Sequence, residues 1–414
     1  MSRIPYEIIT DIFLQLPVKT LLRLRCVSSY LCALIDGLDF VRLHLHRSLR
    51  TKSNLSLILH EWSLSTVDLD DPDSADDPGP AAAASAPLDH HPLYNGGGTD
   101  VLGSCNGLVA LRNSERKLAF YNVSTRKSKL LPVSEVAAPN GVKTGYVFYG
   151  FGYDSVSDDY KLLRMAHLVV EDDEDDVCHY GYQVSVYSLR TDSWKRIEGL
   201  PRCLNFLHRP FYHLMHRRGY GMHASGALHW VLPQSPPLVM EDSIISFDLG
   251  VEAFREIELP DYGNRELSPN LDLGELDGCL CLVCNYRSVG VDVWMMKEYG
   301  VKESWTKLFT VHNMKSVGKL VFLRPLVYSK DGEKVLLEVN DHKFVWYDWN
   351  KKRTKTVRIR DTPKAFGAVM YVSSLVPLRD DAEIERQQRM KQQEEDEKNK
   401  KSDDFLSVGF KLKL

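Results

Sequence analysis

The segment ISFDLGVEAFREIELP (residues 245–260) contains the pattern that decides the fold. Its first residues alternate between apolar and polar side chains, a polar turn follows, and Phe254 begins the returning strand. A period of two is typical of strands with one buried face, so the segment predicts a β-hairpin. The same order of strand, turn and strand recurs in LAFYNVSTRKSKLLP (118–132), VSVYSLRTDSWKRIE (184–198), VDVWMMKEYGVKESWTKLF (291–309) and FVWYDWNKKRTKTVRI (344–359).

A second repeated pattern is a small residue and Gly in front of an apolar strand. It occurs at Asn106-Gly107, Ser225-Gly226 and Asp277-Gly278. Repeats near the length of a kelch repeat indicate a β-propeller, whose blades are four-stranded sheets of roughly 40–50 residues. The uneven spacing predicts an irregular, kelch-like β-propeller over residues 99–378, and the blade count stays open. The competing fold is an open antiparallel β-sandwich, and the repeats favour the propeller.

Residues 1–46 have a different period and predict a small three-helix unit. Apolar residues recur at three- and four-residue spacing from Ile4 to Leu16, Pro17 ends the first helix, and Ser28 can cap the third. Three short helices cannot bury so much apolar surface among themselves. Part of that surface should therefore face a partner, or else pack on the rest of the chain. We expect the propeller to be a separate unit that binds its target without these helices.

Three segments outside these two units are distinguished by composition. Residues 68–98 are rich in Asp, Pro, Ala and Gly and predict a disordered acidic linker or insertion. Residues 379–402 are almost wholly polar and predict a charged tether. Residues 403–414 end in alternating apolar and polar residues, which predicts a C-terminal strand docked on a sheet edge.

Charge and hydropathy bear on the class of partner. The formal net charge is -4, and no basic stripe is evident, which argues against a nucleic-acid partner. No apolar stretch is long enough to span a bilayer, and the N-terminus lacks the pattern of a signal peptide. Eight scattered cysteines favour reduced thiols over a disulfide framework. Together these features predict an intracellular protein that does not act on membranes.

The N-terminal segment resembles the F-box in its plant form. The match rests on Ile4-Pro5, Leu16-Pro17, Arg25-Cys26-Val27, Phe40 and His44-Leu45. It departs where the family usually has Lys-x-Trp, since this chain has Ser29-Tyr30-Leu31. The resemblance implies binding to a Skp-type linker protein, and to a cullin through that linker. The residues expected to contact the linker are Ile4, Pro5, Ile8, Ile9, Ile12, Leu16, Pro17, Leu21, Leu24 and Val27.

The strand-rich region resembles the F-box-associated domain of plant F-box proteins. The match rests on YGFGYDSVSDDYKLLRM (149–165), GALHWVLP (226–233) and SWKRI (193–197), and it extends over nearly the whole chain. It implies a non-catalytic substrate-recognition subunit of an SCF (Skp–cullin–F-box) ubiquitin ligase. Similarity to a defence-related member of the family implies intracellular nucleotide-binding leucine-rich-repeat (NLR) immune receptors as targets, and hence negative regulation of plant defence. The alternatives are an F-box-bearing scaffold without a ligase role and a metal-dependent propeller enzyme.

Two groups of residues are candidates for binding sites. Cys279, Cys281 and Cys284 lie close in sequence, but no second cysteine pair completes a zinc pattern. In a strand the first two point to one face and the third to the other, so we interpret them as buried thiols and predict no metal and no cofactor. The target-binding candidates either contact a target or fill the space between blades, and they are Phe206, Phe211, Tyr212, Arg217, Arg218 and Tyr220.

Overall fold

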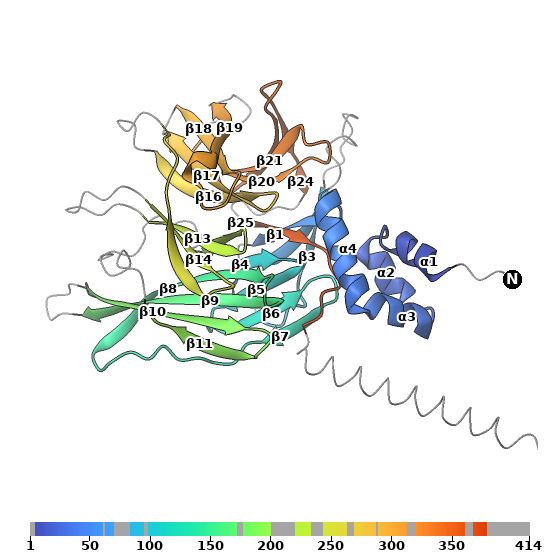
Figure 1. Cartoon of the computed structure of the whole chain (residues 1–414), viewed down its shortest axis with the longest axis horizontal. Helices are drawn as coiled ribbons and strands as arrows, with labels where there is room; N and C mark the ends of the chain where they lie inside the picture. Colours follow the sequence, from blue (N-terminus) through green and yellow to red (C-terminus); the bar gives the residue numbers. More distant parts are fainter. Residues whose placement is uncertain are drawn as a thin grey trace, which may run out of the picture.

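The computed structural model describes residues 5–60, 63–69, 83–94, 98–171, 177–199, 220–232, 243–262, 269–286, 289–312, 320–360 and 367–378. The α-helices gather at one end of the molecule, and the rest of the described chain is mainly strand and turn (Figure 1). The helices are α1 (Tyr6–Phe13), α2 (Val18–Leu24), α3 (Ser29–Asp36) and α4 (Leu38–Thr51), and a short 3-10 helix, η3, covers Lys302–Ser304. None of these helices is long and apolar enough to cross a membrane.

The strands form sheets that follow one another along the chain. The first sheet has the order β24-β3-β2-β1-β25 and joins Ile359–Arg360, Ala83–Pro87, Leu64–Asp68, Leu55–His60 and Gly367–Val372. The next is β4 (Thr99–Cys105), β5 (Leu108–Asn113), β6 (Leu118–Asn122) and β7 (Lys127–Leu130). Two others are β16 (Asn270–Leu276), β17 (Cys279–Tyr286), β18 (Gly290–Met296) and β19 (Trp305–His312), and β20 (Leu323–Tyr328), β21 (Lys334–Val339), β22 (Lys343–Asp348) and β23 (Arg353–Val357).

The remaining sheet has eight strands and consists of two antiparallel meanders. One is β8 (Val142–Asp154), β9 (Asp159–Glu171), β10 (Val177–Ser188) and β11 (Ser193–Ile197). The other is β12 (Tyr220–Ala224), β13 (Ala227–Leu232), β14 (Ser243–Asp248) and β15 (Ala253–Ile257). A short parallel pairing of β12 with β8 joins them, with Tyr220 opposite Tyr149. The architecture is therefore mainly β and propeller-like, as the repeats predict, and we call each four-stranded unit a blade.

The two sequence repeats correspond to two kinds of hairpin turn. Asn106 and Gly107 have φ of 50° and 83°, and the pairs at 225–226 and 277–278 have similar values. Two successive positive φ angles are the signature of the two-residue turn that matches strand twist, and Gly and Asn tolerate them best. These pairs join the first and second strands of three blades. The small-residue-plus-Gly pattern thus marks the hairpin turn in front of an apolar strand.

In the other sequence repeat, the last residue of the first strand has a side chain that caps the turn. Asn122 accepts hydrogen bonds from the backbone N–H groups of Ser124 and Thr125, and Asp248 accepts from those of Gly250 and Val251. Four residues after each capping side chain, the backbone is left-handed. Asx turns of this kind bring the chain back on itself without help from distant residues. The turn between the third and fourth strands of these blades is therefore specified by residues within the turn.

The last strand returns to the first and closes the sequence of sheets. β25 pairs antiparallel with β1, with Leu55 opposite Val372. Arg324 on β20 forms an ion pair with Glu338 at 2.5 Å and donates a hydrogen bond to the carbonyl oxygen of Ala368 on β25, also at 2.5 Å. Glu338 is buried, and the nearby carboxylate keeps the pKa of Arg324 above its usual value despite desolvation. This buried pair connects the last full blade to the sheet that holds both ends of the propeller.

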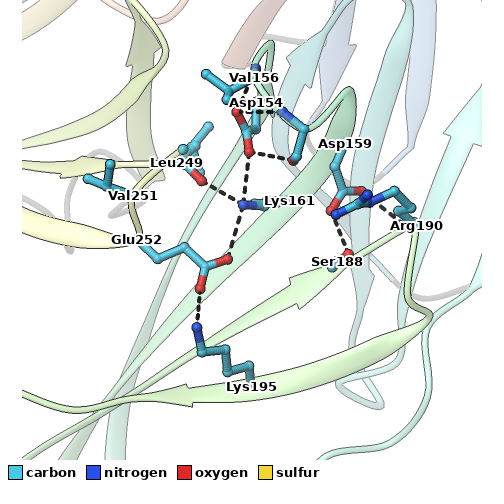
Figure 2. A network of polar contacts seen from close by, with 12 residues as sticks. Asp154, Val156, Asp159, Lys161, Ser188, Arg190, Lys195, Leu249, Val251 and Glu252 are labelled. Atoms are coloured by element: carbon cyan, nitrogen blue, oxygen red, sulfur yellow. Dashed lines mark hydrogen bonds and ion pairs between the residues drawn. The ribbon is translucent and has the colours of Figure 1, made fainter.

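Ion pairs also connect neighbouring blades at their outer strands. Lys195 on β11 contacts Glu252 in the β14–β15 turn at 2.7 Å, and Glu252 also contacts the buried Lys161 at 3.0 Å (Figure 2). Lys161 in turn contacts Asp154 at 3.0 Å and donates to the carbonyl oxygen of Leu249 at 2.6 Å. The Lys161 ammonium is therefore satisfied on several sides, as a buried charge must be. The network binds the β8–β11 blade to the β12–β15 blade.

The structure corrects the sequence prediction in two places. The N-terminal unit has four helices, because Gly37 is extended between α3 and α4, and α4 continues to Thr51, beyond the predicted end at 46. The range 68–98, predicted to be disordered, contains β3, which pairs with β2, and the buried Leu93. Pairing with β2 supplies the backbone partners that composition alone could not reveal. The predicted tether 379–402 and docking strand 403–414 lie outside the described residues, as do 70–82 and 95–97.

The helices and the propeller share one hydrophobic core. Figure 1 shows α4 between the strands and the other three helices. Residues 373–378, which we call the strap, leave β25 and place Leu375, Val376 and Leu378 in one cluster with Phe40, Leu21 and the β4–β7 blade. The buried Asn122 amide holds the strap by donating to the carbonyl oxygens of Ser374 at 3.2 Å and Val376 at 2.9 Å. The two units are therefore not separate, contrary to the expectation from sequence.

Candidate partner-binding interface

Helix α1 has apolar side chains on two neighbouring faces, one covered by the protein and one not. Ile9 and Phe13 pack against the protein's own core. Ile8 and Ile12 lie on the other face and remain 50% and 49% exposed. Single exposed apolar residues are common on protein surfaces, but these two lie one turn apart and form a joint apolar patch. The outer side of α1 is thus a candidate contact surface, and α4 separates it from the propeller (Figure 1).

The junction of α2 and α3 exposes two more large apolar side chains. Val27 is 69% exposed and Tyr30 is 51% exposed. The junction is well defined, because Ser28 Oγ accepts a hydrogen bond from the Leu31 N–H at 3.2 Å and caps α3, as predicted. Arg25 forms an ion pair with Asp36 at 2.7 Å, which joins the end of α2 to the end of α3 and raises the Arg25 pKa. The capped helix and the ion pair therefore hold both exposed side chains in fixed positions.

The structure separates the residues expected to contact the linker into groups. Pro5, Ile8, Ile12, Pro17 and Val27 are exposed and available to a partner. Ile9, Leu16 and Leu24 are partly buried against the shared core. Leu21 is fully buried and cannot contact a partner while the protein is folded, because it packs on the propeller side. Ile4 lies outside the described residues.

His44 fixes α4 against the turn that ends α1. Its Nε2 lies 2.9 Å from the carbonyl oxygen of Leu16, and its ring stacks on Phe40 with 6.0 Å between ring centroids. Burial lowers the His44 pKa, so the neutral ring can donate from Nε2 to this carbonyl. The sequence motif contains His44 but does not reveal this role, since the contact spans 28 residues. His44 therefore positions the exposed α1 side chains.

Further contacts connect α4 with the blades. Arg42 forms an ion pair with Asp158 in the β8–β9 turn. Lys52, just beyond α4, lies 3.2 Å from Asp277 and 4.8 Å from the centroid of the Tyr328 ring. Exposed ion pairs contribute little individually, about 0–1 kcal/mol. Together with the shared core, they fix the direction in which α1 to α3 point relative to the propeller.

The expected target-binding set is mostly outside the described residues. Phe206, Phe211, Tyr212, Arg217 and Arg218 fall in 200–219, and only Tyr220 can be placed. It begins β12 beside Tyr149, and both rings interact electrostatically with Arg112. Arg112 is held by Asp100 at 2.6 Å and lies 5.5 Å from the centroid of the Tyr149 ring. Tyr220 thus adjoins the paired Arg112 on β5 and packs, partly buried, against the shared core.

Several titratable side chains meet where the first strands of three blades approach one another. Cys105 Sγ on β4 lies 3.7 Å from His223 Nδ1 on β12. Burial lowers the pKa of His223 to about 4 and raises that of Cys105 to about 12, so both groups are neutral at pH 7. Within the described ranges, no set of three or more His, Cys, Asp or Glu side chains is arranged to hold a metal ion. The arrangement of His223 and Cys105 accordingly offers neither a thiolate nucleophile nor a complete ligand set.

Glu275 on β16 should make the stability of the fold depend on pH. Burial raises its pKa from 4.5 to about 7, although its carboxylate accepts a hydrogen bond from the Gly278 N–H. Between these two pH values the folded state binds a proton that the unfolded chain has lost. The contribution of Glu275 to stability is therefore full below pH 4.5 and is lost as the pH rises through 7.

We expect the effect of Glu275→Gln on stability to depend on pH. The amide keeps the acceptor oxygen and removes the buried charge. At pH 5 the variant and the parent should unfold at nearly the same temperature, and at pH 8 the variant should be more stable by about 1–3 kcal/mol. Thermal unfolding at both pH values measures the difference. An equal gain at pH 5 and pH 8 would show that charge burial is not its source.

The three clustered cysteines lie on β17, as expected from their spacing. Cys281 packs in the cluster between the β16–β19 and β20–β23 blades, with Cys279 partly buried against it. Cys284 packs in the cluster on the other side of its sheet, toward β12–β15. The thiols therefore point to opposite faces, and burial holds the pKa values of Cys281 and Cys284 well above the usual range.

Comparison with known proteins identifies both units of the chain. The F-box domain family matches residues 1–43, and the F-box associated β-propeller domain family matches residues 81–377. F-box protein CPR1 of Arabidopsis thaliana is 46% identical, with all of both chains covered. F-box protein At4g22390 of the same plant is 38% identical, again over all of both chains. F-box/kelch-repeat protein At3g23880 is 29% identical and covers 81% of this chain and 85% of its own. The chain therefore belongs to the F-box proteins that carry an F-box-associated β-propeller domain.

Proposed function

We propose that this protein is the target-selecting subunit of an SCF-type ubiquitin ligase. The observation that carries the proposal is the exposure of Ile8 and Ile12 on the outer side of α1, within a matched F-box domain. These side chains, with Val27 and Tyr30, would bury their remaining apolar surface on a Skp-type linker, which in turn binds a cullin. A fully buried aliphatic side chain contributes about 1.5–3 kcal/mol. A few such contacts are enough for a stable complex.

The proposed role requires no catalytic residue in this chain. The propeller would hold a target while α1 to α3 hold the linker, so that a target lysine stays close to a charged conjugating enzyme. The resulting gain in rate comes from effective concentration and orientation. The shared core between α4 and the blades supports the proposal, because a fixed spacing between linker and target favours this transfer.

We propose NLR immune receptors as targets, and negative regulation of plant defence in the cytoplasm and nucleus as the outcome. The support is the resemblance over the full length to plant F-box proteins. The test is affinity purification of the tagged chain with the proteasome blocked, followed by mass spectrometry. Linker, cullin and an immune receptor should copurify. Recovery of the linker without a cullin would instead favour a scaffold, and recovery of the ligase without any receptor would reject this target class.

A further inference from the structure

The outermost strand of the last full blade and the residues beside it form an exposed, strongly basic strip. Residues 351–360, which we call the basic edge, read KKRTKTVRIR and contain six Lys or Arg and no Asp or Glu. The side chains of all six basic residues are exposed: Lys351, Lys352, Arg353, Lys355, Arg358 and Arg360. An ion pair within the hairpin, Lys351 to Asp348 at 3.5 Å, offsets one of these charges. A protein with a net charge of -4 thus concentrates positive charge on one edge.

In other blades, basic residues of the outer strands lie beside carboxylates. Lys129 on β7 contacts Asp192 of the next blade at 2.5 Å, and Lys195 on β11 contacts Glu252 of the next blade at 2.7 Å. On β15, Arg255 is followed directly by Glu256, so that strand carries both signs. In each case a carboxylate of this chain accompanies the base. The basic edge departs from this pattern because its own sequence contains six Lys or Arg and no Asp or Glu.

The edge also has a backbone suited to strand pairing. β23 is the last strand of its sheet and pairs with β22 on one side, from Phe344 opposite Val357 to Asp348 opposite Arg353. The other side of an outermost strand presents backbone N–H and C=O groups to an incoming extended chain. Lysine on such edges also prevents two copies of a protein from pairing, since like charges repel. The same charges attract a strand of opposite sign.

We propose that the basic edge binds an extended, acidic segment of a partner protein by adding it as a strand beside β23. A polypeptide fits this surface better than a nucleic acid, because the strip has no aromatic side chain on which a base could stack. The inference does not depend on linker binding, since β23 is distant in sequence from α1 to α3.

The test uses the full chain and a fluorescent peptide of alternating Glu and Val. The peptide should bind, and its affinity should fall as salt rises from about 50 to about 300 mM, because exposed charges are screened over these concentrations. Arg353→Glu with Lys355→Glu should weaken binding at least about tenfold. A matched control, Arg196→Glu with Arg255→Glu, reverses exposed arginines on β11 and β15 and should change binding less than about twofold. A peptide of alternating Lys and Val should not bind.

Three results would overturn the proposal. Equal loss in the control variant would show general attraction to positive charge and no site. Unchanged binding of a peptide methylated at alternate backbone nitrogens would show that no strand is added. Tighter binding of single-stranded oligonucleotide than of the acidic peptide, lost with Arg353→Glu and Lys355→Glu, would assign the edge to nucleic acid.

Discussion

Replacing Ile8 and Ile12 with aspartate should weaken linker binding by at least about 100-fold, which corresponds to about 2.8 kcal/mol. Both side chains are half exposed in the free protein, so the change should leave folding nearly intact. In the complex, the variant loses two apolar contacts and must bury carboxylates without partners, which adds to the loss. The linker titrated against immobilised protein gives the affinity directly.

A matched control for this variant lies on the neighbouring helix. Leu43 and Leu49 of α4 are 53% and 46% exposed, close to the values for Ile8 and Ile12. Leu43→Asp with Leu49→Asp adds the same charges to the same small helical unit but leaves α1 unchanged. We expect it to bind the linker within about threefold of the parent, as substitutions at separate sites usually act independently. Equal loss in both variants, or normal linker and cullin recruitment by the α1 variant, would contradict the assigned surface.

Much of the propeller could be predicted because its signals are local. Asn106-Gly107 and Asp277-Gly278 adopt the two positive φ angles that their residue types tolerate. Asp248 caps its turn with neighbours two and three residues away. By contrast, β3 owes its conformation to β2, and its Ala-rich sequence has little strand propensity of its own. Pairing between distant segments is therefore where the sequence prediction of 68–98 fails.

The candidate interface could be predicted only in part, for a related reason. Spacing shows that Ile8, Ile9 and Ile12 belong to a helix, but both sides of α1 are apolar, so spacing cannot tell which side the protein itself covers. Leu21 is buried because α4 and the strap approach it from remote parts of the sequence. The basic edge was missed because it alternates with Thr and Val inside a strand pattern that already had an explanation.

The shared core gives the last prediction, which concerns whether the helices and the propeller unfold together. Phe40 on α4 is 3% exposed and packs in the cluster that contains the strap and the β4–β7 blade. Truncation of a buried Phe to Ala typically costs 3–5 kcal/mol. Since whole domains are stable by only about 5–15 kcal/mol, Phe40→Ala should lower the urea midpoint of the entire described fold, and not of the helices alone.

Tryptophan fluorescence can distinguish the two cases, because all seven tryptophans lie after residue 60 and none lies in the helices. If the core is shared, Phe40→Ala shifts the fluorescence transition together with the helical circular dichroism signal. Leu43→Ala on the same helix is the control. The free energy of unfolding from either signal should change by no more than about 0.5 kcal/mol in this variant. Deletion of residues 1–46 should go further, since it uncovers Leu375, Val376 and Leu378 and leaves a chain that aggregates. An unchanged fluorescence transition in Phe40→Ala, or a soluble and cooperatively folded deletion variant, would show that the propeller stands alone. If the propeller stands alone, a loss of target binding on deletion of residues 1–46 would reflect lost target contacts. If the core is shared, the same loss would follow from unfolding of the propeller.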